Sequence, residues 1–285
     1  MAIVAVVTVG GLAMPAFITA SLRAANSPAS GVRLAWHSPK KGIGLGSGGG
    51  GKQWRTMLRQ LHVSWVYNWG LHPGARPPKR THFVPMIWGY WPGGLHAGVS
   101  WLKKQHRAGL QKYLLTFNEP DGKGQANLTV ATALKAWPKL ESTGMMLGSP
   151  ACVHPDNSWM RAFMHGAWLR HYRVNFICIH WYGGPNAAAF LEMLNRIHLM
   201  YHRPVWVTEF AVGDWIANRT RPNIYSPQVI ARFMRIVLPA MNRMKFVQCY
   251  AWFPAQKSRY TALGTSALFH KNGSLTLLGR IYAAD

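Results

Sequence analysis

Two glutamates, Glu119 and Glu209, each lie near the end of an apolar run, and together they could break a glycosidic bond. Glu119 belongs to KYLLTFNEP (112–120) and Glu209 to PVWVTEFAV (204–212). One carboxyl group can protonate the leaving oxygen while the other attacks the anomeric carbon, if the two lie about 5–5.5 Å apart. Water then releases the sugar from the enzyme. The two motifs therefore predict a retaining glycosidase with Glu119 and Glu209 as its catalytic residues.

A carboxylate at a strand end can also cap a helix or form a surface salt bridge. The chain has only 8 Asp and Glu residues, however, and two of them lie at equivalent ends of apolar runs. Glu141 and Glu192 fall in helical segments, and Asp156 fits a helix N-cap. The pairing of Glu119 with Glu209 therefore favours catalysis over a structural role.

Polar and aromatic side chains follow the same ends of several apolar runs. Asn118 precedes Glu119 and could hydrogen-bond a sugar 2-hydroxyl, while indole rings can stack on sugar rings. His180 could bind the nucleophile or a sugar hydroxyl, with a core histidine as an equal alternative, and Trp88 and Trp252 could equally be barrel core. The predicted substrate-binding residues are Asn68, Trp69, Trp88, Asn118, His180, Trp181, Tyr182, Trp215 and Trp252.

Eight apolar, β-branched and aromatic runs predict strands, and their near-continuous apolarity is typical of a parallel sheet. The runs start about 31 residues apart on average, the repeat that a (β/α)8 barrel of about 250 residues requires. The step from residue 63 to residue 81 leaves no room for a full helix. We therefore predict an α/β single-domain (β/α)8 TIM barrel. The predicted strands are 31–37, 63–70, 81–89, 112–120, 145–152, 174–183, 204–212 and 246–253.

The charge balance is strongly basic, with 32 Lys and Arg giving a formal net charge of +24. Such a charge could attract nucleic acid, anionic lipid or an acidic glycan. The basic residues are spread along the chain, which favours a solvated surface. Three cysteines without a CxxC pair exclude a disulfide scaffold and disfavour a cysteine zinc site.

The first 20 residues are apolar and uncharged, which predicts a signal peptide over residues 1–25, with a membrane anchor as the alternative. Three N-x-S/T triplets are compatible with secretion. We expect a secreted or cell-wall-associated protein whose catalytic domain spans residues 31–285.

An ordered set of motifs, VSWVYNWG, FVPMIWG, LLTFNEPD, GSPA, HWYG, VWVTEFAV and YAWF, resembles glycoside hydrolase family 128, the Asl1-like hydrolases. The resemblance implies a retaining endo-β-1,3-glucanase on a (β/α)8 barrel, with no metal or other cofactor. It implies Glu119 as acid/base and Glu209 as nucleophile. The sequence departs from the family pattern at Asn175, where Asp is expected, and at Cys249, where Arg is expected.

The expected partner is a β-1,3-glucan polysaccharide or oligosaccharide. We expect no nucleic acid, no membrane once the first segment is removed, and a monomer. Three alternatives stay open: a non-catalytic β-glucan-binding protein on the same barrel, a basic polyanion-binding protein, and a glycosidase of another specificity.

Overall fold

The computed structural model describes residues 38–46, 50–257 and 261–285. The predicted signal peptide and the predicted strand 31–37 lie outside these residues. Helices and strands alternate along the described chain, with one interruption between the second and third strands. The strands are β1 (Lys41–Gly44), β2 (Trp65–Tyr67), β3 (His82–Phe83), β4 (Tyr113–Leu114), β5 (Met146–Leu147), β6 (Ile177–Trp181), β7 (Val205–Phe210) and β8 (Val247–Trp252). The helices are α1 (Gly51–Leu61), α2 (Pro92–Arg107), α3 (Val130–Glu141), α4 (Ser158–Leu169), α5 (Ala187–Tyr201), α6 (Pro227–Arg243) and α7 (Leu277–Ala284), with the 3-10 turn η1 at Thr261–Leu263.

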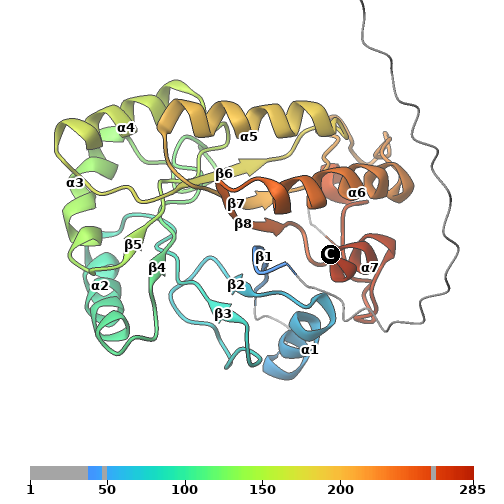
Figure 1. The fold of residues 1–285 in the computed structure, drawn as a ribbon, viewed down its shortest axis with the longest axis horizontal. Helices are drawn as coiled ribbons and strands as arrows, with labels where there is room; N and C mark the ends of the chain where they lie inside the picture. Colours follow the sequence, from blue (N-terminus) through green and yellow to red (C-terminus); the bar gives the residue numbers. More distant parts are fainter. Residues whose placement is uncertain (1–37, 47–49, 258–260) are drawn as a thin grey trace, which may run out of the picture. The chain divides into compact units, whose positions relative to one another are not determined.

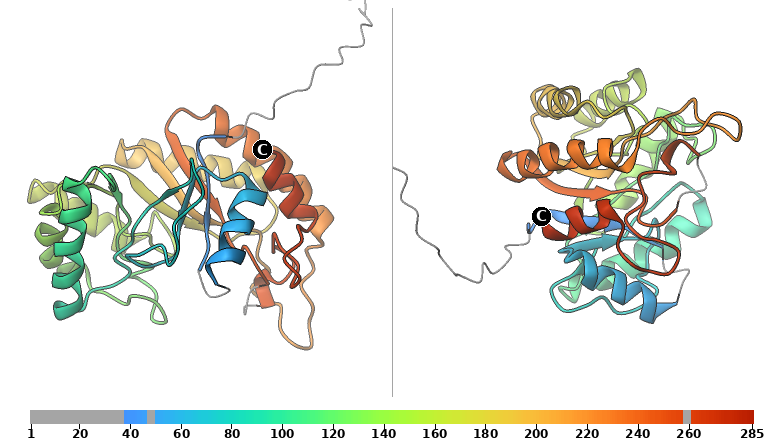
Figure 2. Two further views of the ribbon diagram at one scale, coloured as in Figure 1. Left: turned by 90° about the horizontal axis from the view of Figure 1, so that it is seen from below. Right: turned by 90° about the vertical axis from the view of Figure 1, so that its right-hand side faces the viewer.

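These strands form a ring of parallel pairs. Six of them follow the order β3-β2-β1-β8-β7-β6, and β4 pairs with β5. Parallel bridges from Met86 to Leu115 and from Gly148 to Phe176 join the two sheets on both sides. The helices lie outside the strands (Figures 1 and 2). The predicted α/β class is therefore confirmed, and the ring of parallel pairs is consistent with the predicted TIM-barrel-like fold.

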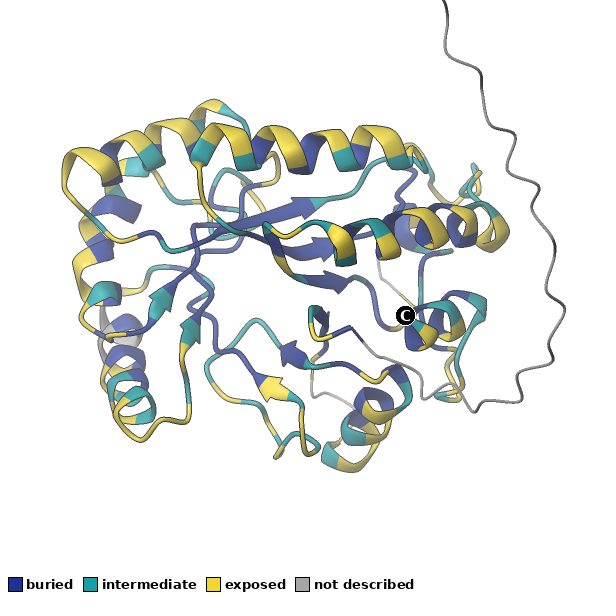
Figure 3. Ribbon diagram, viewed as in Figure 1, coloured by how far each residue is buried: buried dark blue, intermediate teal, exposed yellow. Residues whose placement is uncertain are grey.

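Alternating side chains along the strands form two apolar layers. The inner layer fills the ring with large aromatic residues, and the Trp206 ring stacks on Phe176 at 4.3 Å and contacts Trp65 at 5.4 Å. The outer layer packs the strands against the helices, where Trp54, Trp137 and other apolar side chains are buried. Figure 3 shows that most strand residues are buried. The helices that surround the strands have exposed outer faces.

The first strand of the ring is β1, which the sequence analysis did not identify because it is rich in glycine. Gly42 is required there: a Cβ at this position would lie 2.2 Å from the Trp65 indole. The glycines therefore let the inner Trp65 ring pack against the strand while hiding its β signal.

The helix starts mostly confirm the sequence analysis. Ser226 accepts a hydrogen bond from the Val229 amide, and Pro227 occupies the first turn of α6. Asp156 is not an N-cap as predicted; the neighbouring Asn157 caps α4 by accepting from the Met160 amide. No helix lies between β2 and β3 in the described chain, as the short spacing of these two strands predicts.

The amino-terminal end of the ring contains a buried lysine. Lys41 is fully buried, and its Nζ donates to the carbonyl oxygens of Tyr282 (2.7 Å) and Ala283 (3.3 Å) at the end of α7. Burial lowers the pKa of Lys41 to about 8, although Asp285 partly offsets this effect. The ammonium group therefore caps a helix C-terminus but is poorly solvated.

Both departures from the family pattern have local structural roles. Asn175 Oδ1 accepts a hydrogen bond from the Leu147 amide at 2.8 Å. Cys249 is half-buried against the inner layer, while Cys152 and Cys178 are fully buried free thiols. Among the described residues, no helix is both long and apolar enough to cross a membrane.

Candidate active site

Glu209 lies on β7 with its carboxylate surrounded by hydrogen-bond donors. Its Oε1 accepts from the Tyr67 hydroxyl at 2.9 Å and from the Trp69 indole at 2.7 Å. Its Oε2 accepts from the Tyr182 hydroxyl. Three neutral donors, from the end of β2 and the segments that follow β2 and β6, therefore fix both oxygens and compensate their negative charge.

The two tyrosines are suited to remain donors. Burial and the charge of Glu209 raise the pKa of Tyr67 well above its ordinary value. Burial, and to a lesser extent the charge of Glu209, also raise the pKa of Tyr182 well above its ordinary value. Both hydroxyls therefore keep their protons at pH values where Glu209 carries a charge.

Glu119 follows β4 with an unusual backbone conformation. Its φ of 42° lies in the left-handed region, which non-glycine residues seldom adopt. The Glu119 amide donates to the Ala151 carbonyl at 2.7 Å, which holds this turn against the neighbouring strand. Trp69, with a φ of 61°, is a second positive-φ residue at the site. Such strain is typical of functional positions.

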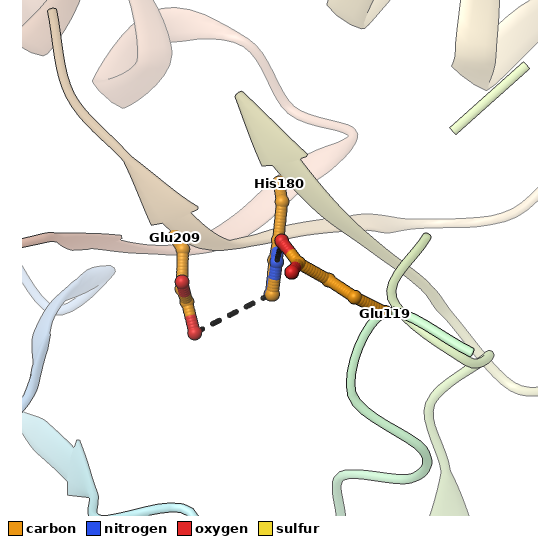
Figure 4. Close-up of side chains that lie close together, drawn as sticks. All are labelled: Glu119, His180 and Glu209. Carbon is orange, nitrogen blue, oxygen red and sulfur yellow. Dashed lines mark hydrogen bonds and ion pairs between the residues drawn. The ribbon is translucent and has the colours of Figure 1, made fainter. Parts of the chain in front are cut away.

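His180 lies between the two glutamates. Its Nδ1 is 2.9 Å from Glu119 Oε1, and its Nε2 is 3.6 Å from Glu209 Oε1 (Figure 4). Burial alone would lower the pKa of this imidazole, but the charges of Glu209 and Glu119 and the hydrogen bond to Glu119 outweigh burial and raise it. The ring therefore links both carboxyl groups while only 1% of its side chain is exposed.

Ligand atoms of Glu119, His180 and Glu209 all lie within 4.8 Å of one another. This short separation matches two carboxyl groups that act on one glycosidic bond without a water between them. The same trio is the described group that could hold a metal ion. Because both nitrogens of His180 already face a carboxylate, a shared proton fits this arrangement better than a cation.

A cavity of about 1270 Å³ surrounds the two glutamates. This volume exceeds the roughly 300–1,000 Å³ of small-molecule sites and suits an oligomeric ligand. Most of the predicted substrate-binding residues line it, from strands on several sides of the ring. They are Trp69, Trp88, Asn118, His180, Trp181, Tyr182 and Trp215.

Two predicted substrate-binding residues do not line the cavity. Trp252 is fully buried, and its indole donates to the Ser266 carbonyl at 2.8 Å, so its prediction as a binding residue is wrong. It points to the outer layer, one of the two possibilities for a residue within a strand. The Asn68 side chain instead shapes the turn after β2, where it donates to the His72 carbonyl and accepts from the Gly70 amide.

Tyr67 and Gln125 also belong to the site and were not among the predicted residues. Tyr67 ends β2 two residues before Trp69, so strand alternation within the predicted run 63–70 could have placed both side chains on the same inner face. Gln125 Oε1 accepts from Asn118 Nδ2 at 3.2 Å and lines the cavity. It lies in a connection with no regular pattern, so nothing in the sequence signals its contact with Asn118.

Asp214 fixes the connection that presents Trp215 to the cavity. Its Oδ2 accepts from the Ile224 amide at 3.1 Å, which closes the loop between them. The Trp215 indole donates to the Tyr182 carbonyl at 2.6 Å. Asp214 thus orients a loop next to the cavity.

Residues 43–282, which include both glutamates and the whole cavity, match the family model described as the glycosyl hydrolase catalytic core. The chain belongs to this glycosyl hydrolase family. The match spans most of the ring from β1 to α7, so the fold and the catalytic face both belong to the family's catalytic core.

Solved glycosyl hydrolases of family 128 are similar to this one, which confirms the predicted family. An endo-β-1,3-glucanase of subgroup I from Amycolatopsis mediterranei, with a glutamate replaced by glutamine and bound to laminarihexaose, is 34% identical. The likeness covers 86% of this chain and 99% of that chain, with a TM-score of 0.73. A curdlan-specific exo-β-1,3-glucanase of subgroup III from Blastomyces gilchristii is 26% identical, covering 86% and 97% of the two chains with a TM-score of 0.62.

A curated relative is the alkali-sensitive linkage protein 1 of Schizosaccharomyces pombe. It is 26% identical over 240 residues, which cover 77% of this glycosyl hydrolase. The aligned region spans 40% of the relative's own length.

Proposed function

We propose that this glycosyl hydrolase is a retaining endo-β-1,3-glucanase. The observation that carries the proposal is the placement of Glu119 and Glu209 oxygens within 4.8 Å of each other in the lining of one large cavity. Inverting enzymes need about 6.5–9.5 Å between their carboxyl groups to admit a water. The shorter separation supports direct attack by one carboxylate.

The unequal surroundings of the two glutamates support their roles. Glu209, held by Tyr67, Trp69 and Tyr182, remains an anion and attacks the anomeric carbon to form a glycosyl ester. Glu119 has one side-chain partner, His180, and gives its proton to the leaving glycosidic oxygen. A water then loses a proton to Glu119 and attacks the anomeric carbon, which frees Glu209 and retains the configuration.

The substrate class is supported by the relatives and by the cavity. The solved family 128 structure at 34% identity binds laminarihexaose, a β-1,3-linked glucose oligomer, and is described as an endo-enzyme. In this chain, Trp69, Trp88 and Trp215 line the same cavity as the two glutamates. Several indole surfaces along one cavity suit a polymer held over successive sugar units.

We propose that the enzyme acts as a monomer outside the cell, on wall or other extracellular glucan. The substrate class supports this location, since β-1,3-glucans are structural polysaccharides. The prediction that residues 1–25 form a signal peptide concerns residues outside the described structure and stays a prediction.

Laminarin digestion tests the proposal. Wild-type enzyme is expected to release a series of short oligosaccharides, and proton NMR of the first products should detect the β-anomer before mutarotation. Glu119→Gln and Glu209→Gln should each lower kcat by at least about 100-fold, the usual range for acid–base groups. Release of glucose alone would contradict the endo assignment, and α-anomeric first products would contradict retention. Full activity in either variant would contradict the assigned roles.

A further inference from the structure

Acidic residues are absent from the first 118 residues of the sequence, which contain 14 Lys and Arg. The described part of this stretch, from β1 to the start of β4, forms one side of the ring (Figure 1). We call the described residues between 38 and 112 the basic sector. Lys and Arg also occur throughout the remaining chain, but there the 8 acidic residues partly compensate them.

Exposed Lys and Arg residues occur on α1, on the connection 68–81, on α2 and just after α2. Figures 1 and 2 show α1 and α2 on either side of β2 and β3. No helix covers β2 and β3 between them in the described chain, and the connection 68–81 passes there instead. The exposed cations are Lys52 and Arg59 on α1, Arg76, Lys79 and Arg80 on the connection, Lys104 and Arg107 on α2, and Lys112.

The connection and α1 lie in direct contact. A Cβ built on Gly51 would lie only 2.9 Å from the Ala75 Cβ. This contact brings the segment carrying Arg76 next to the first turn of α1, which carries Lys52. The two cations therefore belong to one continuous surface rather than to separate parts of the molecule.

These cations have no carboxylate partners. Ion pairs among the described residues join Arg173 to Glu141, Arg196 to Asp156, and His180 to the two glutamates of the active site. The segments outside the description contain no Asp or Glu that could pair with the sector. The positive field of this surface is thus uncompensated by ion pairs.

Helix stability explains only part of this charge. Lys104 and Arg107 lie in the last turn of α2, where cations interact favourably with the helix dipole. Lys52, in contrast, lies in the first turn of α1, which has no acidic residue. A cation there is unfavourable for the helix, and Arg76, Lys79 and Arg80 lie on no helix at all.

We propose that the basic sector binds an acidic polysaccharide, a linear polymer of carboxylate-bearing sugars, separately from the glucan in the catalytic cavity. Several unpaired cations exposed on one side of a protein attract such a polymer by releasing its counterions. Single-stranded nucleic acid would require exposed aromatic rings among the cations. In the described sector Trp91 is the one exposed Phe, Tyr or Trp, and it stacks on Trp88 of the cavity at 5.8 Å.

Binding to immobilised polygalacturonate tests this proposal without any need for hydrolytic activity. One variant removes the five exposed cations of α1 and the connection 68–81 by Lys52→Gln, Arg59→Gln, Arg76→Gln, Lys79→Gln and Arg80→Gln. A matched control removes the same number of exposed cations elsewhere by Arg232→Gln, Arg235→Gln, Arg243→Gln, Lys245→Gln and Lys271→Gln. Thermal unfolding and laminarin hydrolysis verify that both variants are folded.

The sector variant is expected to bind polygalacturonate about tenfold or more weakly at 50 mM NaCl, with a shallower dependence of affinity on salt. The control variant should stay within about threefold of wild type. Equal losses in both variants would assign binding to net charge alone and overturn the proposal. It would also be overturned by a wild type that does not bind polygalacturonate, or that binds oligo(dT) of equal charge more tightly. A failure to cleave laminarin would count against the glucanase and leave this binding result intact.

Discussion

The hydroxyl of Tyr67 donates to Oε1 of Glu209 at 2.9 Å and so joins β2 to β7 through the interior of the ring. Replacement of Tyr67 by Phe removes this donor and keeps the shape of the aromatic side chain. Because a hydrogen bond to a charged group contributes about 1.5–3 kcal/mol, kcat should fall about 10- to 150-fold. Steady-state kinetics on laminarin measures the loss.

Tyr250→Phe is the matched control for Tyr67→Phe. Tyr250 is also fully buried, and its hydroxyl donates to Asp285 Oδ2 at 2.5 Å, outside the cavity. This variant should lose stability in urea but retain its kcat. A similar loss of kcat in both variants would show that the effect of Tyr67 is merely structural.

Trp215 and Trp252 should respond to substitution in different ways. Trp215 is 58% exposed and lines the cavity, so Trp215→Ala should raise the KM for laminarihexaose by about 3- to 10-fold with little loss of stability. Trp252 is fully buried, so Trp252→Ala should cost about 3–5 kcal/mol of unfolding free energy.

Trp168→Ala provides the control for the exposed indole. Trp168 is 70% exposed on α4 and does not line the cavity, so its removal should leave the KM unchanged. Comparable changes in KM for the Trp168 and Trp215 variants would contradict a role for Trp215 in substrate binding.

His180 should make stability depend on pH. Its pKa in the folded protein is raised above the ordinary 6.5, because the two glutamates outweigh burial. Its stabilising contribution is therefore complete below pH 6.5 and is lost as pH rises through the raised pKa of the folded state. The free energy of unfolding of wild type minus that of His180→Gln, measured in urea from pH 5 to pH 9, should decrease with pH. A constant difference would contradict this assignment.

Lys41 should act in the opposite direction and at higher pH. Its pKa is about 8 in the folded protein against an ordinary 10.5, so the unfolded chain binds more protons between these values. The stability of wild type relative to Lys41→Met should therefore increase from pH 8 to pH 10.5, by up to about 3 kcal/mol. Buried tyrosines and cysteines titrate in the same range, but they are common to both proteins and cancel in the difference. A difference that falls with pH would contradict the burial of a charged Lys41.

The sequence predicts the strands and the convergence of Glu119 and Glu209 on one cavity because each signal is local. Apolar runs with polar ends define strands, and Glu119 and Glu209 interrupt such runs. The strand β1 was missed because Gly42 replaces the usual branched residue to admit the Trp65 ring, a constraint from another strand. The residue type at such a position is determined by packing against a neighbouring strand. It therefore cannot be predicted from the sequence of one strand alone.

The same limit applies to individual side chains of the site. A tryptophan at a strand end can face the cavity, as Trp69 does, or the helices, as Trp252 does. One residue of register decides between these outcomes. Tyr67 could have been predicted from the sequence because it shares the inner face with Trp69. The position of Gln125 depends on the path of a loop, which the sequence pattern does not indicate.

The left-handed backbone conformation at Glu119 lowers the stability of the folded protein at a residue proposed to act in catalysis. A side chain with a Cβ is held there in a conformation that glycine, asparagine and aspartate adopt more readily. A residue that relaxes the main chain at this position would also remove the acid of the proposed mechanism. Selection for stability alone would favour a residue that relaxes this backbone, so a glutamate held in this conformation supports the proposed role in catalysis.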